Sequence, residues 1–87
     1  MITQAKHSRV ALITGGAKGL GRYMARTLAG AGYRIAFSYW HSEEQAQELL
    51  RLIEHTGGEA LAVQADITNS QHLNDFVRQT EPRFGQI

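Results

Sequence analysis

The stretch ALITGGAKGLG, residues 11–21, is a short apolar run that ends in a cluster of glycines. A segment with helical periodicity follows it, from Leu20 to Ala31. Glycine lets the backbone turn sharply and lets a ligand approach it closely. The head of a helix adds unpaired N–H groups and a partial positive charge. This stretch therefore predicts a strand, a tight turn and a helix that together favour a bound phosphate.

The spacing of this turn distinguishes it from other phosphate-binding loops. It follows the pattern Thr14-Gly15-x-x-x-Gly19-x-Gly21 instead of Gly-x-Gly-x-x-Gly. Lys18 is followed by Gly19, so the Ser or Thr of a P-loop is absent. An ordinary strand-to-helix turn is the alternative interpretation. The strand pattern before the glycines and the helical pattern after them favour a dinucleotide-binding turn instead.

Three strands are expected, at residues 10–14, 33–39 and 60–65, because each is a short apolar run of strand length. Each is followed by a segment with apolar residues at helical spacing. These apolar stripes are Leu20, Met24, Leu28 and Ala31, then Ala46, Leu49, Leu50 and Ile53, and finally Leu73, Phe76 and Val77. The alternation predicts an α/β fold, the N-terminal βαβαβα half of a doubly wound parallel sheet with strand order 3-2-1.

The ends of these elements carry their own signals. Ser42 is expected to cap the second helix and Ser70 the third, which Pro82 and Gly85 should end. Residues 1–8 lack an apolar period and are predicted to form a flexible leader. The expected domain then covers residues 9–87 and stops before a fourth strand.

Two motifs resemble those of a known family. The turn TGGAKGLG, residues 14–21, resembles the cofactor signature of the short-chain dehydrogenase/reductase family. The segment Asp66-Ile67-Thr68, after the third strand, resembles the acidic residue that this family places beside the adenine ring. The 3-oxoacyl-(acyl carrier protein) reductase-like members are the nearest in resemblance. The resemblance implies an NAD(P)-binding Rossmann fold and an oxidoreductase that reduces a carbonyl to an alcohol by hydride transfer.

A set of residues is expected to contact the dinucleotide. The glycine turn and helix head should hold the pyrophosphate, through Gly15, Ala17, Gly19, Leu20 and Gly21. Gly21 should also allow the helix to pack closely on the sheet. By resemblance, Ala17 and the backbone of Leu20 are contact points, and Asp66 with Ile67 lies beside adenine.

The end of the second strand indicates which dinucleotide binds. An NAD site places a carboxylate there, whereas this chain has Tyr39 and no acid before Glu43. By resemblance, Lys18 corresponds to the basic residue of NADP-preferring members, although Trp40 stands where such relatives often have arginine. We therefore predict NADP(H) over NAD(H). The residues expected near the 2′-phosphate are Lys18, His41 and Ser42. Tyr39 is a further cofactor-binding candidate at the strand end, and for Tyr39 and Trp40 packing at that end is favoured over stacking on adenine.

The family's catalytic pair is missing from this chain. The resemblance implies a tyrosine with a lysine four residues later, but Ile2 and Thr14 precede Lys6 and Lys18 at that spacing. No catalytic residue is therefore assigned. Two hypotheses follow: the N-terminal portion of an NADP-dependent oxidoreductase acting on a small carbonyl or 3-oxoacyl thioester, or a catalytically inactive nucleotide-binding or association module.

Composition narrows the classes of partner. The 87 residues include no cysteine, which fits a reducing compartment, expected to be the cytoplasm, and there is no apolar run of membrane-spanning length. Residues 1–34 carry a charge of +6 and residues 35–87 a charge of −5, a field that would attract an anionic cofactor, with chance asymmetry as the alternative. No nucleic-acid-binding module accompanies the basic half.

Two further expectations concern metal binding by the histidines and pairing at the edge of the sheet. No metal site is expected, because the four histidines have no ligand spacing, and His7, His55 and His72 are assigned to the surface. If the 87-residue chain folds alone, the strand at 10–14 would form an open edge of the sheet, which favours pairing between copies. A homo-oligomer is expected.

Overall fold

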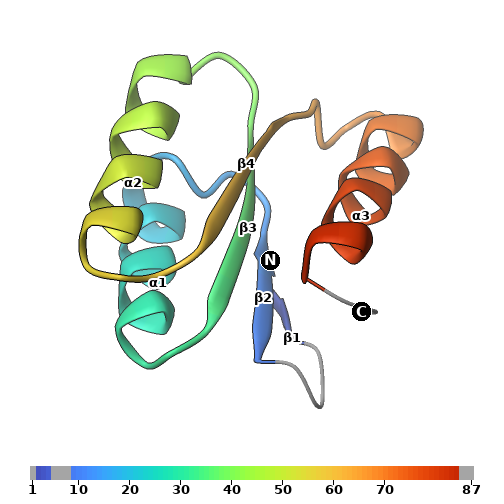
Figure 1. Cartoon of the computed structure of the whole chain (residues 1–87). Helices are drawn as coiled ribbons and strands as arrows, with labels where there is room; N and C mark the ends of the chain where they lie inside the picture. The colour runs from blue at the N-terminus through green and yellow to red at the C-terminus, as the bar shows by residue number, and fades with distance from the viewer. Residues whose placement is uncertain (1, 5–8, 85–87) are drawn as a thin grey trace.

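The computed structural model describes residues 2–4 and 9–84, which form a four-stranded sheet with helices on both faces (Figure 1). In chain order the elements are β1 (Ile2–Gln4), β2 (Val10–Ile13), α1 (Gly19–Gly30), β3 (Arg34–Tyr39), α2 (Glu43–His55), β4 (Ala60–Gln64) and α3 (Ser70–Phe84). From residue 10 onward, the predicted alternation of strands and helices is confirmed. Each predicted boundary lies within one residue of the observed one, except at the end of α3.

Strands β2, β3 and β4 are parallel and lie in that order across the sheet. Leu12 pairs with Ala36, which pairs in turn with Leu61. These three strands are the predicted first, second and third, so the order 3-2-1 is confirmed. Parallel order brings their carboxyl ends to one edge of the sheet, which is the edge where ligands bind in open α/β folds.

The two faces of the sheet are covered by different helices. Helices α1 and α2 lie on one face and α3 on the other (Figure 1). Alternate residues of β2 and β3 enter the two cores, since side chains of a strand alternate between its faces. Ile13 and Phe37 pack in the core that includes residues of α1 and α2, whereas Leu12 and Ala36 pack in the core that includes Phe76 of α3. All four strand residues are buried, as expected for a parallel sheet covered on both faces.

Strand β1 differs from the predicted flexible leader. Residues 2–4 pair with β2 in antiparallel orientation, with Ile2 opposite Ile13 and Gln4 opposite Ala11. The remaining leader positions, 1 and 5–8, lie outside the described residues. The unpaired N–H and C=O groups of a sheet edge favour such pairing. The expectation that β2 forms an open edge is therefore wrong, because β1 covers it.

The buried face of α1 also differs from its predicted stripe. Leu20 is 73% exposed and Ala31 is exposed, whereas Ala25, outside the stripe, is fully buried. Met24 and Leu28 pack against the core as expected. Small residues allow α1 to lie close to the sheet, so the contact face includes an alanine that large-residue periodicity does not reveal.

Both ends of α3 depart from the expectation. Asn69 caps the helix, since its side-chain Oδ1 accepts hydrogen bonds from the N–H groups of Gln71 and His72, and Ser70 is the first helical residue. At the other end, α3 continues through Pro82 to Phe84, while Gly85 lies outside the described residues. The buried ring of Phe84 and the Arg34 side chain, which donates to the Phe84 carbonyl at 2.8 Å, stabilise this last turn.

The predicted face of α2 is confirmed, with Ala46, Leu49 and Ile53 buried and Leu50 packed against them. Ser42 occupies the N-cap position, although its side chain makes no capping hydrogen bond. Within the described ranges 2–4 and 9–84, none of the helices has both the length and the apolar character needed to cross a membrane.

Candidate functional site

The glycine-rich turn between β2 and α1 is attached to β3 through Ser38. The Gly15 N–H donates to the Ser38 side-chain Oγ at 3.1 Å, and the Gly16 N–H donates to the Ser38 carbonyl at 3.0 Å. Ser38 is fully buried, and a buried hydroxyl needs such a partner. These two hydrogen bonds hold the turn at the carboxyl ends of β2 and β3.

Two glycines are required by close packing. A Cβ at position 16 would lie 2.6 Å from the Phe37 Cβ, and a Cβ at position 21 would overlap the carbonyl oxygen of Gly15. The close approach at Gly21 is therefore between α1 and the turn that follows β2, and its predicted role in packing the helix on the sheet stays a prediction. The head of α1 and the turn consequently hold each other in position.

Two other glycines border open space. Gly15 and Gly19 have positive φ angles of 69° and 56°, and a Cβ at either position would meet no atom within 4 Å. Lys18, the N-cap of α1, makes no side-chain capping bond, and the first turn contains no acidic residue. The Arg22 N–H donates to the Lys18 carbonyl at 3.2 Å, whereas the N–H groups of residues 19–21 precede the i→i−4 hydrogen bonds of α1. This bare backbone with its N–H donors fits a diphosphate.

The remaining predicted residues of the turn differ in exposure. Ala17 is only 3% exposed and packs in the core, so only its backbone can face a ligand. Lys18 and Leu20 are exposed beside the open backbone. A flexible cation therefore lies next to the positions that fit a phosphate.

The segment after β3 contains no carboxylate in residues 39–42. Tyr39 packs against the core, which is the alternative expected for it. Trp40 is 40% exposed, His41 is exposed and Ser42 is half-buried. The Trp40 ring centroid lies 5.2 Å from that of His41 and 5.6 Å from that of His72 on α3.

The segment after β4 is organised around Asp66. Its side-chain Oδ1 accepts hydrogen bonds from the Thr68 hydroxyl at 2.7 Å and the Thr68 N–H at 3.0 Å. These donors lower the pKa of Asp66 below its ordinary value, and His72 and His41 add a smaller favourable charge effect. The carboxylate is therefore ionised at neutral pH. Ile67, the next residue, is 51% exposed.

We expect Thr68→Val to raise the pKa of Asp66, because the variant loses the hydroxyl donor, which is the largest cause of the lowered pKa. Thr68→Ser keeps a hydroxyl and should leave that pKa close to the parent value. An NMR titration of the Asp66 carboxyl carbon measures the shift. Identical titration curves for the Val variant and the parent would contradict the assignment of this hydrogen bond.

The structure brings the three predicted segments to one edge of the sheet, where the glycine turn and the chain leaving β3 and β4 meet (Figure 1). Two polar residues of this edge were not predicted as site residues. Ser38 appears in the sequence only as a polar residue within an apolar strand run. His72 was assigned to the surface, but it is half-buried, and its Nδ1 accepts a hydrogen bond from the Asp66 N–H at 3.1 Å. His55 is exposed as expected, and His7 lies outside the described residues.

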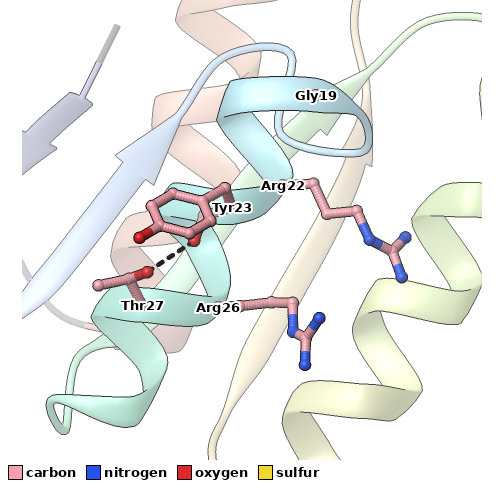
Figure 2. Close-up of a pocket in the computed structure, with 5 residues that line it drawn as sticks. All are labelled: Gly19, Arg22, Tyr23, Arg26 and Thr27. Atoms are coloured by element: carbon pink, nitrogen blue, oxygen red, sulfur yellow. Dashed lines mark hydrogen bonds between the residues drawn. The ribbon is translucent and has the colours of Figure 1, made fainter.

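A cavity of about 500 Å³ borders the same turn along α1 (Figure 2). Its lining residues are Gly19, Arg22, Tyr23, Arg26 and Thr27. Figure 2 shows the two arginines pointing toward α2 and Tyr23 with Thr27 on the other side of the helix. Arg22 forms an ion pair with Glu48 of α2 at 2.5 Å. The Arg22 charge is thus compensated by Glu48, and Lys18 and Arg26 are the exposed cations near the head of α1.

The fold and this edge together define a class of protein. Open parallel sheets with a glycine turn leading into a helix bind nucleotides at the carboxyl ends of their strands. Among residues 2–4 and 9–84, no group of three histidine, cysteine, aspartate or glutamate residues is arranged to hold a metal ion. The parallel sheet and the glycine turn are those of a nucleotide-binding α/β protein.

The model of the short chain dehydrogenase family matches residues 9–87, nearly the whole chain. The protein belongs to the short-chain dehydrogenase/reductase family.

Several curated relatives are similar over most of this chain. Hydroxynaphthalene reductase arp2 of Aspergillus fumigatus is 37% identical over 79 residues, which are 91% of this chain and 29% of the relative. The short-chain dehydrogenase/reductase homolog YusS of Bacillus subtilis is 34% identical over 80 residues, 92% of this chain and 73% of YusS. A 3-oxoacyl-[acyl-carrier-protein] reductase of Synechocystis is 34% identical over 80 residues, 92% of this chain and 32% of the enzyme.

Several solved structures have a fold similar to that of this chain. A blue fluorescent protein from a metagenomic library, in complex with NADPH, has a TM-score of 0.86 and 35% identity, over 88% of this chain and 32% of that protein. A short-chain dehydrogenase from Burkholderia cenocepacia, in complex with NADP, has a TM-score of 0.84 and 33% identity, over 94% and 33%. The chain thus spans about a third of the length of these proteins and of most of the relatives named above.

Proposed function

We propose that this chain is the NADP(H)-binding N-terminal portion of a short-chain oxidoreductase that reduces a carbonyl group to an alcohol. The observation that carries this proposal is the bare backbone at Gly15 and Gly19, where a Cβ would meet no atom of the described residues within 4 Å, next to the N–H groups that begin α1. Such a position supplies donors and a favourable dipole for the diphosphate that joins the two nucleotides. Gly21 and Leu20 contribute backbone there as well.

The preference for NADP(H) is supported by the lack of a carboxylate in residues 39–42 and by the exposed cation Lys18. Residues 39–42 offer no carboxylate to accept from an unmodified ribose and none to repel a 2′-phosphate. Lys18 is exposed and can approach that phosphate, with His41 and Ser42 as further polar groups nearby. Two of the similar solved structures are complexes with NADPH or NADP, which agrees with this preference.

The adenine ring is proposed to lie beside the segment after β4. The ionised carboxylate of Asp66 uses Oδ1 for both hydrogen bonds from Thr68. Among the described residues, none donates to Oδ2, which can accept from the amino group of adenine. The exposed side chain of Ile67 supplies apolar surface next to it.

The reacting substrate is proposed to be a small carbonyl compound or a 3-oxoacyl thioester. This part of the proposal is supported by similarity to a 3-oxoacyl-[acyl-carrier-protein] reductase and to a hydroxynaphthalene reductase. Bound NADPH would supply the hydride. The residues of this chain bind and orient the adenosine diphosphate half of the cofactor, and we assign none of them to proton transfer.

Calorimetric titration with NADPH and NADH tests the proposed cofactor. We expect NADPH to bind at least about tenfold more tightly than NADH, because a 2′-phosphate gains a charged partner in Lys18. Lys18→Gln should lower the affinity for NADPH about tenfold and leave the affinity for NADH unchanged within about twofold.

Arg51→Gln is the matched control, because it removes the same charge from an exposed position on α2. Its affinities should equal those of the parent protein. Equal dissociation constants for NADPH and NADH in the parent would overturn the preference for NADP(H). The absence of binding by either dinucleotide would overturn the proposed function itself.

A further inference from the structure

We propose that Trp40 is the surface on which the adenine ring stacks, and that His72 is a positioning residue that holds Trp40 and the Asp66 turn together. This inference rests on the proposed dinucleotide function. It concerns two residues that neither the glycine turn nor the acidic residue after β4 identifies.

The first observation is the exposure of Trp40. A tryptophan buries a large apolar area when it packs in a core, yet this one keeps 40% of its surface exposed at the ligand-binding edge. Its backbone is held, because the Gln64 side-chain Nε2 donates to the Trp40 carbonyl at 3.2 Å. The Trp40 backbone is therefore fixed between the ends of β3 and β4, while part of the ring surface stays exposed.

The second observation is the contact between Trp40 and two imidazoles. The His41 and His72 rings are tilted by 53° and 57° to the indole, with centroids 5.2 Å and 5.6 Å away. Tilted aromatic pairs at such distances are favourable and restrict the rotation of each ring. Because His41 belongs to the chain after β3 and His72 belongs to α3, the indole is contacted from two separate elements.

The third observation is the hydrogen bond that His72 makes. Its Nδ1 accepts a hydrogen bond from the Asp66 N–H at 3.1 Å. One imidazole thus contacts the Trp40 ring and also fixes the backbone of Asp66. The stacking surface and the carboxylate proposed to accept from adenine are linked through a single side chain.

In this arrangement the protein would recognise the adenine ring in two ways, by stacking and by a hydrogen bond. The face of Trp40 would stack on the base, and Asp66 Oδ2 would accept from its amino group. Base–aromatic stacking contributes to affinity for any base, whereas the carboxylate favours a base that carries an amino donor. His72 keeps the two groups at a constant separation.

Trp40 is the only tryptophan of the chain, so its fluorescence reports directly on this site. We expect adenosine 2′,5′-bisphosphate to quench it in a saturable manner and nicotinamide mononucleotide to leave it unchanged. Calorimetry of NADP⁺ with Trp40→Ala should show about tenfold weaker binding, whereas Trp40→Phe keeps an aromatic face and should stay within about threefold of the parent.

Two substitutions separate the functions of His72. His72→Asn keeps an acceptor for the Asp66 N–H but removes the ring, and His72→Phe keeps a ring against Trp40 but removes the acceptor. Each should weaken adenosine 2′,5′-bisphosphate binding about threefold to tenfold and leave unchanged the binding of inorganic pyrophosphate, which occupies only the proposed diphosphate position at the head of α1. A purely structural role would lower the melting temperature and weaken both ligands equally.

The outcomes distinguish this inference from the proposed function. If NADP⁺ binds the parent by calorimetry while Trp40 fluorescence does not change and Trp40→Ala binds normally, adenine lies elsewhere and only this inference fails. If neither NADP⁺ nor NAD⁺ binds the parent, both fail together. Quenching by the adenosine fragment, with the graded effects of the Ala and Phe variants, supports the inference.

Discussion

Gly21→Ala is expected to unfold or severely destabilise the protein. The new Cβ would overlap the Gly15 carbonyl oxygen and lie 3.0 Å from both the Gly15 carbonyl carbon and the Gly16 Cα. These are backbone atoms of a turn fixed to buried Ser38, so they cannot move without loss of hydrogen bonds. We expect a loss of at least about 3 kcal/mol in the free energy of unfolding, which lowers the Tm by roughly 15 °C in a domain of this size.

Gly30→Ala is the matched control within the same helix. Gly30 is the last residue of α1, and a Cβ there would meet no atom within 4 Å. Alanine has the higher helix propensity, so the melting temperature should stay equal or rise slightly. Thermal unfolding followed by circular dichroism compares the two variants. Equal melting temperatures for Gly21→Ala and the parent would show that the turn does not pack against the helix head.

The part of the fold that depends on periodicity was predictable from the sequence. Buried parallel strands are continuous apolar runs, and helices that cover them carry apolar residues every three or four positions. The stripe of α2, with Leu49 at its centre, illustrates this. The predicted apolar stripe of α1 is wrong at Leu20, which is exposed. Ala25 faces the core instead, and alanine contributes little to an apolar pattern.

Two predictions that the structure shows to be wrong, on residues 2–4 and on the end of α3, concern contacts between distant segments. Nothing in residues 2–4 alone indicates a strand, since their pairing depends on the otherwise unpaired edge of β2. Likewise, α3 extends past Pro82 because Phe84 is buried and its carbonyl receives the side chain of Arg34, 50 residues earlier. The pattern of residues within one segment does not identify a contact with a residue so far away in the sequence.

In the candidate site, too, local sequence patterns were predictive and contacts between separate segments were not. The glycine turn was recognisable because its residues are adjacent in sequence and each has a local conformational reason. Ser38 and His72 were missed because their partners, Gly15 and Asp66, lie 23 and 6 residues away. The backbone positions proposed to contact the cofactor were thus named from the sequence, while the side chains that hold those positions in place required the structure.

Gly19→Val is expected to abolish high-affinity dinucleotide binding. Gly19 has a φ of +56° in which a β-branched residue is strained by about 1–2 kcal/mol, and its Cβ would project into the open space proposed for the diphosphate. The branched side chain would cover the N–H donors of the α1 head. We expect at least about a 100-fold loss of NADPH affinity, equivalent to roughly 2.7 kcal/mol, measured by calorimetry.

Gly57→Val separates this effect from strain alone. Gly57 also has a positive φ, +88°, and a Cβ there would likewise meet no atom within 4 Å, but it follows α2 at the opposite end of the sheet. Both variants should lose similar stability, because both force valine into the left-handed region. Only Gly19→Val should lose affinity, since only there does the side chain enter the proposed cofactor site. Full NADPH affinity in a folded Gly19→Val variant would mean that the diphosphate does not bind at the head of α1.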